Sequence, residues 1–172
     1  MKDIPFEQLL KNAQKEASKF RGEATPAFKK IEQILLVSGN SEYLARFGAL
    51  NLEGTDYKAV ENALIEAYCM EDLCYFAKHC KYANIEKICD VVISSNSAEW
   101  NFYCAENFKK APIKKHEQVV LAAGEPKWNY YFARDIKGAQ IAKHFMAIVL
   151  SAPQSEWHKD FVQDLYIEKH AN

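Results

Sequence analysis

Glycine is scarce in this sequence, with six residues in 172, and the six are scattered along the chain. A phosphate-binding loop needs several glycines within a few residues, because backbone N–H groups must come close to the phosphate. The chain has no such loop, and it has neither the GxSxG turn of serine hydrolases nor the HExxH helix of zinc proteases. We therefore expect no catalytic residues and no cofactor.

Paired cysteines and long apolar runs are also missing. The five cysteines are odd in number and lack the CxxC spacing of a zinc site, so we expect no metal. No run of eighteen apolar residues occurs, and the first twenty residues carry charges every few positions, unlike a signal peptide. We expect a cytoplasmic protein that does not enter a membrane.

What the sequence does contain is a copy of itself. The stretch WNFYCAENFKKAPIKKH, Trp100 to His116, is followed 28 residues later by WNYYFARDIKGAQIAKH, Trp128 to His144, and nine of the seventeen positions are identical. Weaker copies precede it, with Ala77 and Ala49 matching Ala105 at steps of 28. Repetition covers about residues 25–165.

Each copied unit is predicted to be two short helices. Apolar residues recur at spacings of three, four and seven in each half, and Gly138 in KGA supplies the turn between them. A hairpin of 28 residues cannot bury its apolar stripes alone, so copies must stack. We expect an all-α fold, a right-handed α-solenoid of stacked antiparallel helical hairpins with about eleven helices. It would form one domain over 1–172: a cap helix in 1–24, hairpin repeats in 25–151, and a capping helix in 152–172.

The repeated pattern W-N-x-Y-[FC]-A-x-x-[IF]-K-x-A-x-I-x-K-H resembles tandem helical repeats of the YFARDIKGADI type in bacterial and phage proteins. It is similar in kind, though not in period, to tetratricopeptide and HEAT repeats. The resemblance implies no catalytic residues. It implies a protein that binds other macromolecules.

Two residue types, histidine and tryptophan, recur at matched positions of the repeat and are candidate site residues. His116 and His144 recur in successive units and could bind a metal or respond to pH, but Ile88 and Val60 hold the same place earlier, which favours a seam between helices. Trp100, Trp128 and Trp157 could stack on bases or grip a peptide. Aromatic residues at a fixed repeat position are more often wedges between hairpins, and we favour packing for both series.

The cysteines follow the repeat as well. Cys80 and Cys104 stand where other units carry Leu, Phe or Ile, which predicts core positions. Cys89 stands where other units have Glu61, Glu117 and Phe145, which predicts an outward or interface position.

Charge is uneven along the chain. Residues 41–100 hold ten acidic residues against five Lys or Arg, whereas residues 101–150 hold eight Lys or Arg against four acidic residues. In stacked hairpins Lys109 and Lys137 would form one ladder, and Lys115 and Lys143 another, about 10 Å apart. Such ladders could follow phosphates or an acidic protein face. The candidate basic surface comprises Lys109, Lys110, Lys114, Lys115, Arg134, Lys137 and Lys143.

The last full unit departs from the pattern at two positions. Phe145 and Met146 stand where earlier units carry mostly polar residues, so an apolar patch replaces a polar face. Either the C-terminal helix, with Trp157, Phe161 and Leu165, covers this patch or a partner does.

From these features we predict a protein–protein interaction module without catalysis, such as a phage or mobile-element inhibitor or adaptor acting on a host or defence complex. The alternative is a nucleic-acid-binding protein that uses the basic face of residues 101–150. A homodimer through an exposed hairpin is also compatible with the sequence.

Overall fold

The hydrophobic stripes of the repeat appear as short helices in a computed structural model that describes residues 5–20 and 23–167. The described residues form eleven α-helices and no strand, as the sequence predicts. Their contacts divide the chain after Asn84. The single domain over 1–172 and the handedness of the solenoid remain predictions.

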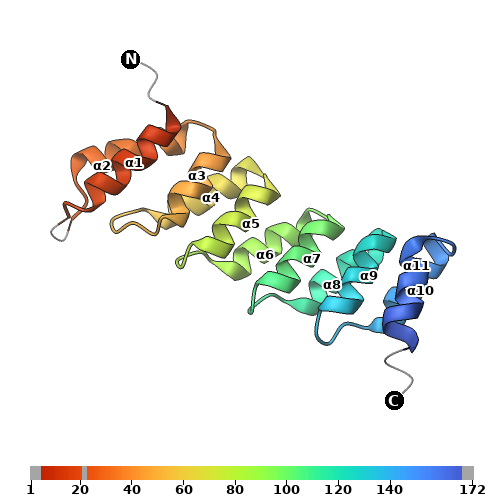
Figure 1. Cartoon of the computed structure of the whole chain (residues 1–172). Helices are drawn as coiled ribbons and strands as arrows, with labels where there is room; N and C mark the ends of the chain where they lie inside the picture. Colours follow the sequence, from red (N-terminus) through yellow and green to blue (C-terminus); the bar gives the residue numbers. More distant parts are fainter. Residues whose placement is uncertain (1–4, 21–22, 168–172) are drawn as a thin grey trace. The chain divides into compact units, whose positions relative to one another are not determined.

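The first unit contains five helices, which run from red to yellow-green in Figure 1. They are α1 (Phe6–Ala17), α2 (Pro26–Val37), α3 (Ser41–Ala49), α4 (Tyr57–Ala67) and α5 (Met70–His79). The expected cap helix is α1, which buries Leu9, Leu10 and Ala13. Within this unit α2 contacts α3 and α4, and α3 contacts α4 and α5, which is the contact pattern of stacked hairpins.

The second unit contains α6 (Ile85–Ser94), α7 (Ala98–Asn107), α8 (Ile113–Ala123), α9 (Pro126–Asp135), α10 (Ile141–Ser151) and α11 (Glu156–Phe161). The same contact pattern continues, so α7, α9 and α11 form one layer and α6, α8 and α10 the other. The helix α11 continues as a π-helical segment, Val162–Ile167. It contacts α9 and α10 and occupies the place expected for the C-terminal capping helix. The predicted contact of Leu165 lies outside the described side chains.

Helix starts agree with the local chemistry of the sequence. Side-chain oxygens of Thr25, Ser97 and Ser155 accept backbone N–H groups at the starts of α2, α7 and α11. Pro26 and Pro126 stand in the first turns of α2 and α9, where a missing N–H costs no hydrogen bond. N-cap side chains and first-turn prolines therefore mark where these helices begin.

A phenylalanine core runs along the first helix of each repeat. Phe47, Phe76, Phe132 and Phe161 are fully buried, and Cys104 takes the equivalent place in α7. Because Phe47 corresponds to Phe76, the residue equivalent to Ala77 is Gly48. The earliest step of the repeat is thus 29 residues, and the match of Ala77 with Ala49 was wrong by one.

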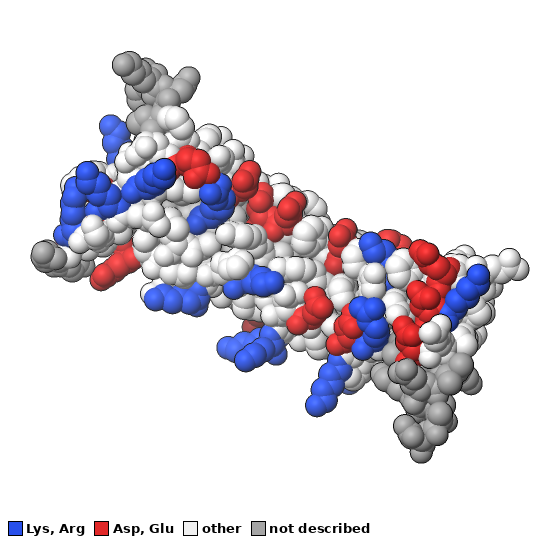
Figure 2. All heavy atoms as spheres, in the orientation of Figure 1, with Lys and Arg blue, Asp and Glu red and all other residues white. Residues whose placement is uncertain are grey.

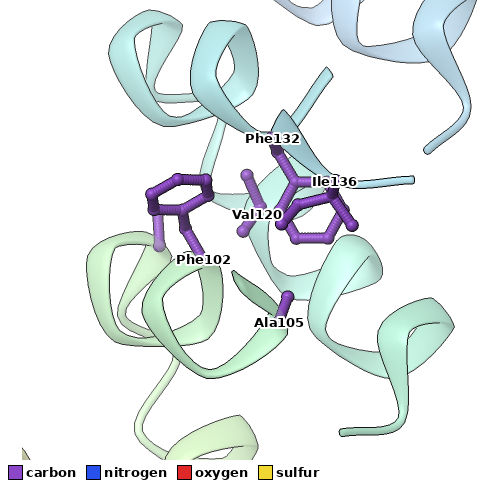
Figure 3. Close-up of a cluster of buried hydrophobic side chains, with 6 residues drawn as sticks. Phe102, Ala105, Val120, Phe132 and Ile136 are labelled. Carbon is purple, nitrogen blue, oxygen red and sulfur yellow. The ribbon is translucent and has the colours of Figure 1, made fainter. Parts of the chain in front are cut away.

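The tryptophans join neighbouring hairpins. Trp128 of α9 packs against Phe102 of α7 at 5.7 Å between ring centroids, and Trp157 of α11 packs against Tyr131 of α9 at 5.5 Å. Figure 3 shows the core beneath the first contact, where Phe102 and Ala105 of α7 meet Val120 of α8 and Phe132 and Ile136 of α9. The interpretation of the tryptophans as packing wedges is confirmed for Trp128 and Trp157.

Candidate binding surface

An apolar groove lies between α8 and α10 on the outer side of the second unit. Its volume is about 620 Å³. It is lined by Leu121, Gly124, Ala142, Lys143, Met146, Ala147, Leu150 and Ser151. Met146 and Leu150 are 51% and 78% exposed, although both are large apolar side chains. The groove is shallow and open, and an exposed apolar surface of this kind is a candidate binding site.

The groove exists because α10 is apolar on two faces. His144 and Ile148 point into the core and are fully buried. On another face, Lys143, Met146, Ala147 and Leu150 follow the i, i+3, i+4, i+7 spacing of a single helical stripe, and all four line the groove. A surface helix needs one apolar face for the core, so the second one is available for something else.

The two unusual positions of the last repeat have different environments. Phe145 stacks on His158 at 5.6 Å and meets Phe161 at 5.3 Å, so the C-terminal helix covers it. Met146 is outside that contact and lines the groove. Of the two explanations for the apolar patch, the C-terminal helix accounts for Phe145 and leaves Met146 open to solvent.

Two lysines predicted to form one ladder lie near the same turn-side hollow. Lys109 and Lys137 line one hollow of about 420 Å³ between the two hairpins, and Lys110 is exposed in the same turn as Lys109. Glu106 and Asp135 line the same hollow. Acidic groups therefore offset this part of the ladder.

Other basic side chains also have acidic partners. Lys115 lies 3.5 Å from Asp90, while its neighbour Lys114 is exposed. Arg134 donates from Nε and from a terminal nitrogen to the two carboxylate oxygens of Asp135 at 2.7 and 2.8 Å. This pairing raises the pKa of Arg134. On the face drawn in Figure 2, acidic and basic side chains are interspersed, which does not favour a phosphate track.

The matched histidines are fully buried in an asparagine–histidine pair that recurs. The amide nitrogen of Asn101 donates to the carbonyls of Val92 and Ser97, so its oxygen accepts from Nδ1 of His116 at 2.7 Å. Asn129 and His144 repeat this arrangement at 2.8 Å. The pair fixes the ring so that Nε2 faces the preceding repeat.

What each Nε2 meets differs between the repeats. Nε2 of His144 lies 3.3 Å from Oε1 of Glu117, and a hydrogen bond between them needs one shared proton. Burial lowers the pKa of His144, and the Glu117 carboxylate opposes that shift. Nε2 of His116 has no oxygen or nitrogen partner, because the residue that faces it is Cys89.

Cys89, Cys104 and His116 form a buried cluster. Hydrogen bonds with Cys104 and then His116 lower the pKa of Cys89 to about 6, against the effect of burial. With Asn101 behind the histidine, the residue types are those of a cysteine nucleophile with its base. All four side chains have no exposed surface, so no substrate reaches the sulfur. Of the two positions predicted for Cys89, the outward one was wrong, because the side chain lies at a buried contact of α6 with α7 and α8.

The glutamates at the same repeat position explain that error. Glu32, Glu61 and Glu117 are buried, and each accepts the backbone N–H of the residue before the next helix of its layer. The acceptor distances are 2.6 Å to Asp56, 2.7 Å to Asn84 and 2.5 Å to Gln140. We call this series the glutamate ladder. At the remaining step the preceding residue is Pro112, which has no N–H, and the glutamate is replaced by Cys89.

Sequence reasoning missed Leu121, Ala142 and Leu150 as groove residues. The available signal was α10 itself, whose apolar residues occupy more than one helical face. Among the described residues, no cluster of three or more histidine, cysteine or acidic side chains could hold a metal ion, and no described helix could span a bilayer. Comparison with protein-family models, with curated proteins and with solved structures found no match.

Proposed function

We propose that this chain is a non-catalytic protein-binding module whose binding surface is the groove between α8 and α10. The observation that carries the proposal is the exposure of Met146 and Leu150 in a shallow, mostly apolar groove. Burying a side chain of this size contributes about 1.5–3 kcal/mol, so a partner that covers both gains substantial binding energy. Binding without chemistry is what an inhibitor or an adaptor requires.

The distribution of titratable groups supports binding over catalysis. The groups with the chemistry of a nucleophile and a base, Cys89 and His116, lie in the core and not in the groove. An active site needs such groups where a substrate can reach them.

Nucleic acid is the weaker candidate. Arg134 is held by Asp135, Lys115 lies near Asp90, and Lys109 and Lys137 share their hollow with two acidic residues. Phosphate binding depends on cations that are free to replace counterions.

Site-specific photo-crosslinking tests the proposal in the organism that makes the protein. A photoreactive phenylalanine analogue replaces Met146 in one variant and Val37, an exposed apolar residue of α2, in the control. We expect a protein adduct from position 146 that position 37 does not give. Absence of any adduct at 146 contradicts the proposal. A mobility shift with DNA or RNA at low salt, lost when Lys109, Lys115, Lys137 and Lys143 are replaced, would favour the alternative.

A further inference from the structure

We infer that the groove between α8 and α10 receives an amphipathic helix that presents an acidic side chain to Lys143. This inference rests on the proposed function and specifies the partner's chemistry. Three properties of the groove lead to it: its shape, its apolar stripe and the position of its charge.

The shape of the groove suits a helix. One side of it is α10, the other is the C-terminal end of α8 with Leu121 and Gly124, and three of its lining residues, Gly124, Ala142 and Ala147, have little or no side chain. Small residues allow a partner's backbone to come close, as ridges of one helix enter the groove between two others. The exposed stripe from Lys143 to Leu150 spans about 10 Å at the helical rise of 1.5 Å per residue. A partner helix of two to three turns covers that length.

The apolar stripe also defines the pattern that its partner needs. Met146, Ala147 and Leu150 lie on adjacent turns, so a helix that packs along them must present apolar residues at i, i+3 or i+4, and i+7. Such a stripe supplies affinity along the whole groove. It does not by itself decide the partner's charge.

The charge expected of the partner follows from Lys143, which lies at one end of the groove. Among the described residues that line the groove, Lys143 alone is charged. It stands in the first turn of α10, where the N-terminal end of the helix dipole is also positive. Lys114 and Lys115 stand in the first turn of α8, the neighbouring wall. None of the described lining residues is acidic, so the complementary group must come from the partner.

Two other occupants fit the groove less well. A second copy docked through this surface brings no acidic lining residue to meet Lys143. A bilayer favours an apolar face with several cations around it, whereas this surface has a single lysine in its lining. An acidic amphipathic helix satisfies both the shape and the charge.

The experiment is a display selection with the full chain as bait. A library of 15-residue helical peptides is selected against the native protein alone, so that no variant of the groove biases the outcome. The expected winners carry apolar residues at the stated spacing and an Asp or Glu at one end. Failure to enrich any peptide, or enrichment of peptides without this pattern, overturns the inference.

Fluorescence anisotropy with one selected peptide then tests each contact. Leu150→Lys and Met146→Lys are expected to weaken binding by about tenfold or more, as removal of central apolar anchors does. Lys143→Glu should weaken binding of the acidic peptide. The same variant should strengthen binding of a peptide in which the acidic residue is replaced by Lys. The matched control is Val37→Lys, which changes an exposed apolar residue on α2 and should bind as the native protein does. Circular dichroism verifies that each variant is folded.

Several outcomes would contradict the inference. These are equal binding to Leu150→Lys, indifference of the acidic peptide to Lys143→Glu, a concentration-dependent dimer that excludes the peptide, and binding to anionic vesicles that the peptide does not compete with. Failure of the two proposals can be told apart. A native partner that crosslinks at Met146 through a loop or a basic helix keeps the proposed function and refutes this inference.

Discussion

Replacing Cys89 with glutamate and Pro112 with glutamine would rebuild the missing step of the glutamate ladder. The backbone is already suited to it, because Pro112 has φ −75° and ψ 77° while Gln140 has φ −80° and ψ 73°. An N–H at residue 112 should therefore point as the Gln140 N–H does toward Glu117. Space is also available, because the small Cys104 takes the repeat position at which the next unit has the larger Phe132, stacked on His144.

Each single change should destabilise the second unit. Cys89→Glu alone buries a carboxylate with His116 as its partner and no backbone N–H, and an incompletely paired buried charge costs about 3–5 kcal/mol. Pro112→Gln alone adds a buried donor that faces a thiol and loosens the unfolded chain, the latter effect costing about 0.4–1 kcal/mol.

In the double variant the new N–H binds the new carboxylate. A hydrogen bond to a charged group contributes about 1.5–3 kcal/mol, so the two changes should be coupled by about that amount. With a urea m-value of about 2 kcal/mol/M, the double variant should unfold about 1 M later than additivity predicts.

Tryptophan fluorescence is the suitable assay, because all three tryptophans, Trp100, Trp128 and Trp157, lie in the second unit. The reciprocal cycle, Glu117→Cys with Gln140→Pro, is the internal control and should show coupling of the same sign. Additivity within about 0.5 kcal/mol in both cycles would refute the account of the ladder.

Three further predictions concern individual residues. The pKa of His144 is lowered in the folded state, so the unfolded state binds more protons below about pH 6.5. Stability measured by tryptophan fluorescence should therefore fall from pH 7 to pH 5, and less steeply in His144→Gln; an equal slope contradicts this. Gly48→Ala should cost about 1–3 kcal/mol by overpacking, because a Cβ there meets the Phe76 ring at 2.5 Å, and a higher melting temperature by circular dichroism is the opposing result. A thiol reagent should modify Cys69, which is half-buried, well before the four buried cysteines, and two or more fast thiols would be inconsistent with the fold.

The sequence predicts the helices well, because the repeat shows several residues at each structurally equivalent position. Val60, Ile88 and the two histidines at one position indicate a buried seam, and the seam is there. Proline and N-cap residues mark the helix starts because their preferences are local.

Polar residues with long-range partners could not be predicted in the same way. Glu61 and Glu117 follow the composition of an exposed position, and only the fold shows that each meets a backbone N–H 23 residues further along. One signal was nevertheless present. Cys89 replaces glutamate where Pro112 removes the N–H, and the two substitutions occur in the same step.

The groove was partly predictable. Met146 stands out as an apolar residue at a polar repeat position, whereas Leu150 and Ala142 resemble ordinary helix residues until the neighbouring wall of α8 is known. A binding surface made by two helices depends on which faces the core leaves unused. Periodicity counts the apolar residues of α10 but does not assign them to the core or to solvent.

The glutamate ladder has an order in time. In each step the acceptor precedes the donor along the chain: Glu32 before Asp56, Glu61 before Asn84, and Glu117 before Gln140. A ribosome therefore releases each carboxylate before the amide that it will bind. At these three steps the acceptor is therefore in place when its donor emerges, whereas the step from Cys89 to Pro112 has no such bond, so the order of synthesis favours pairing in one direction only.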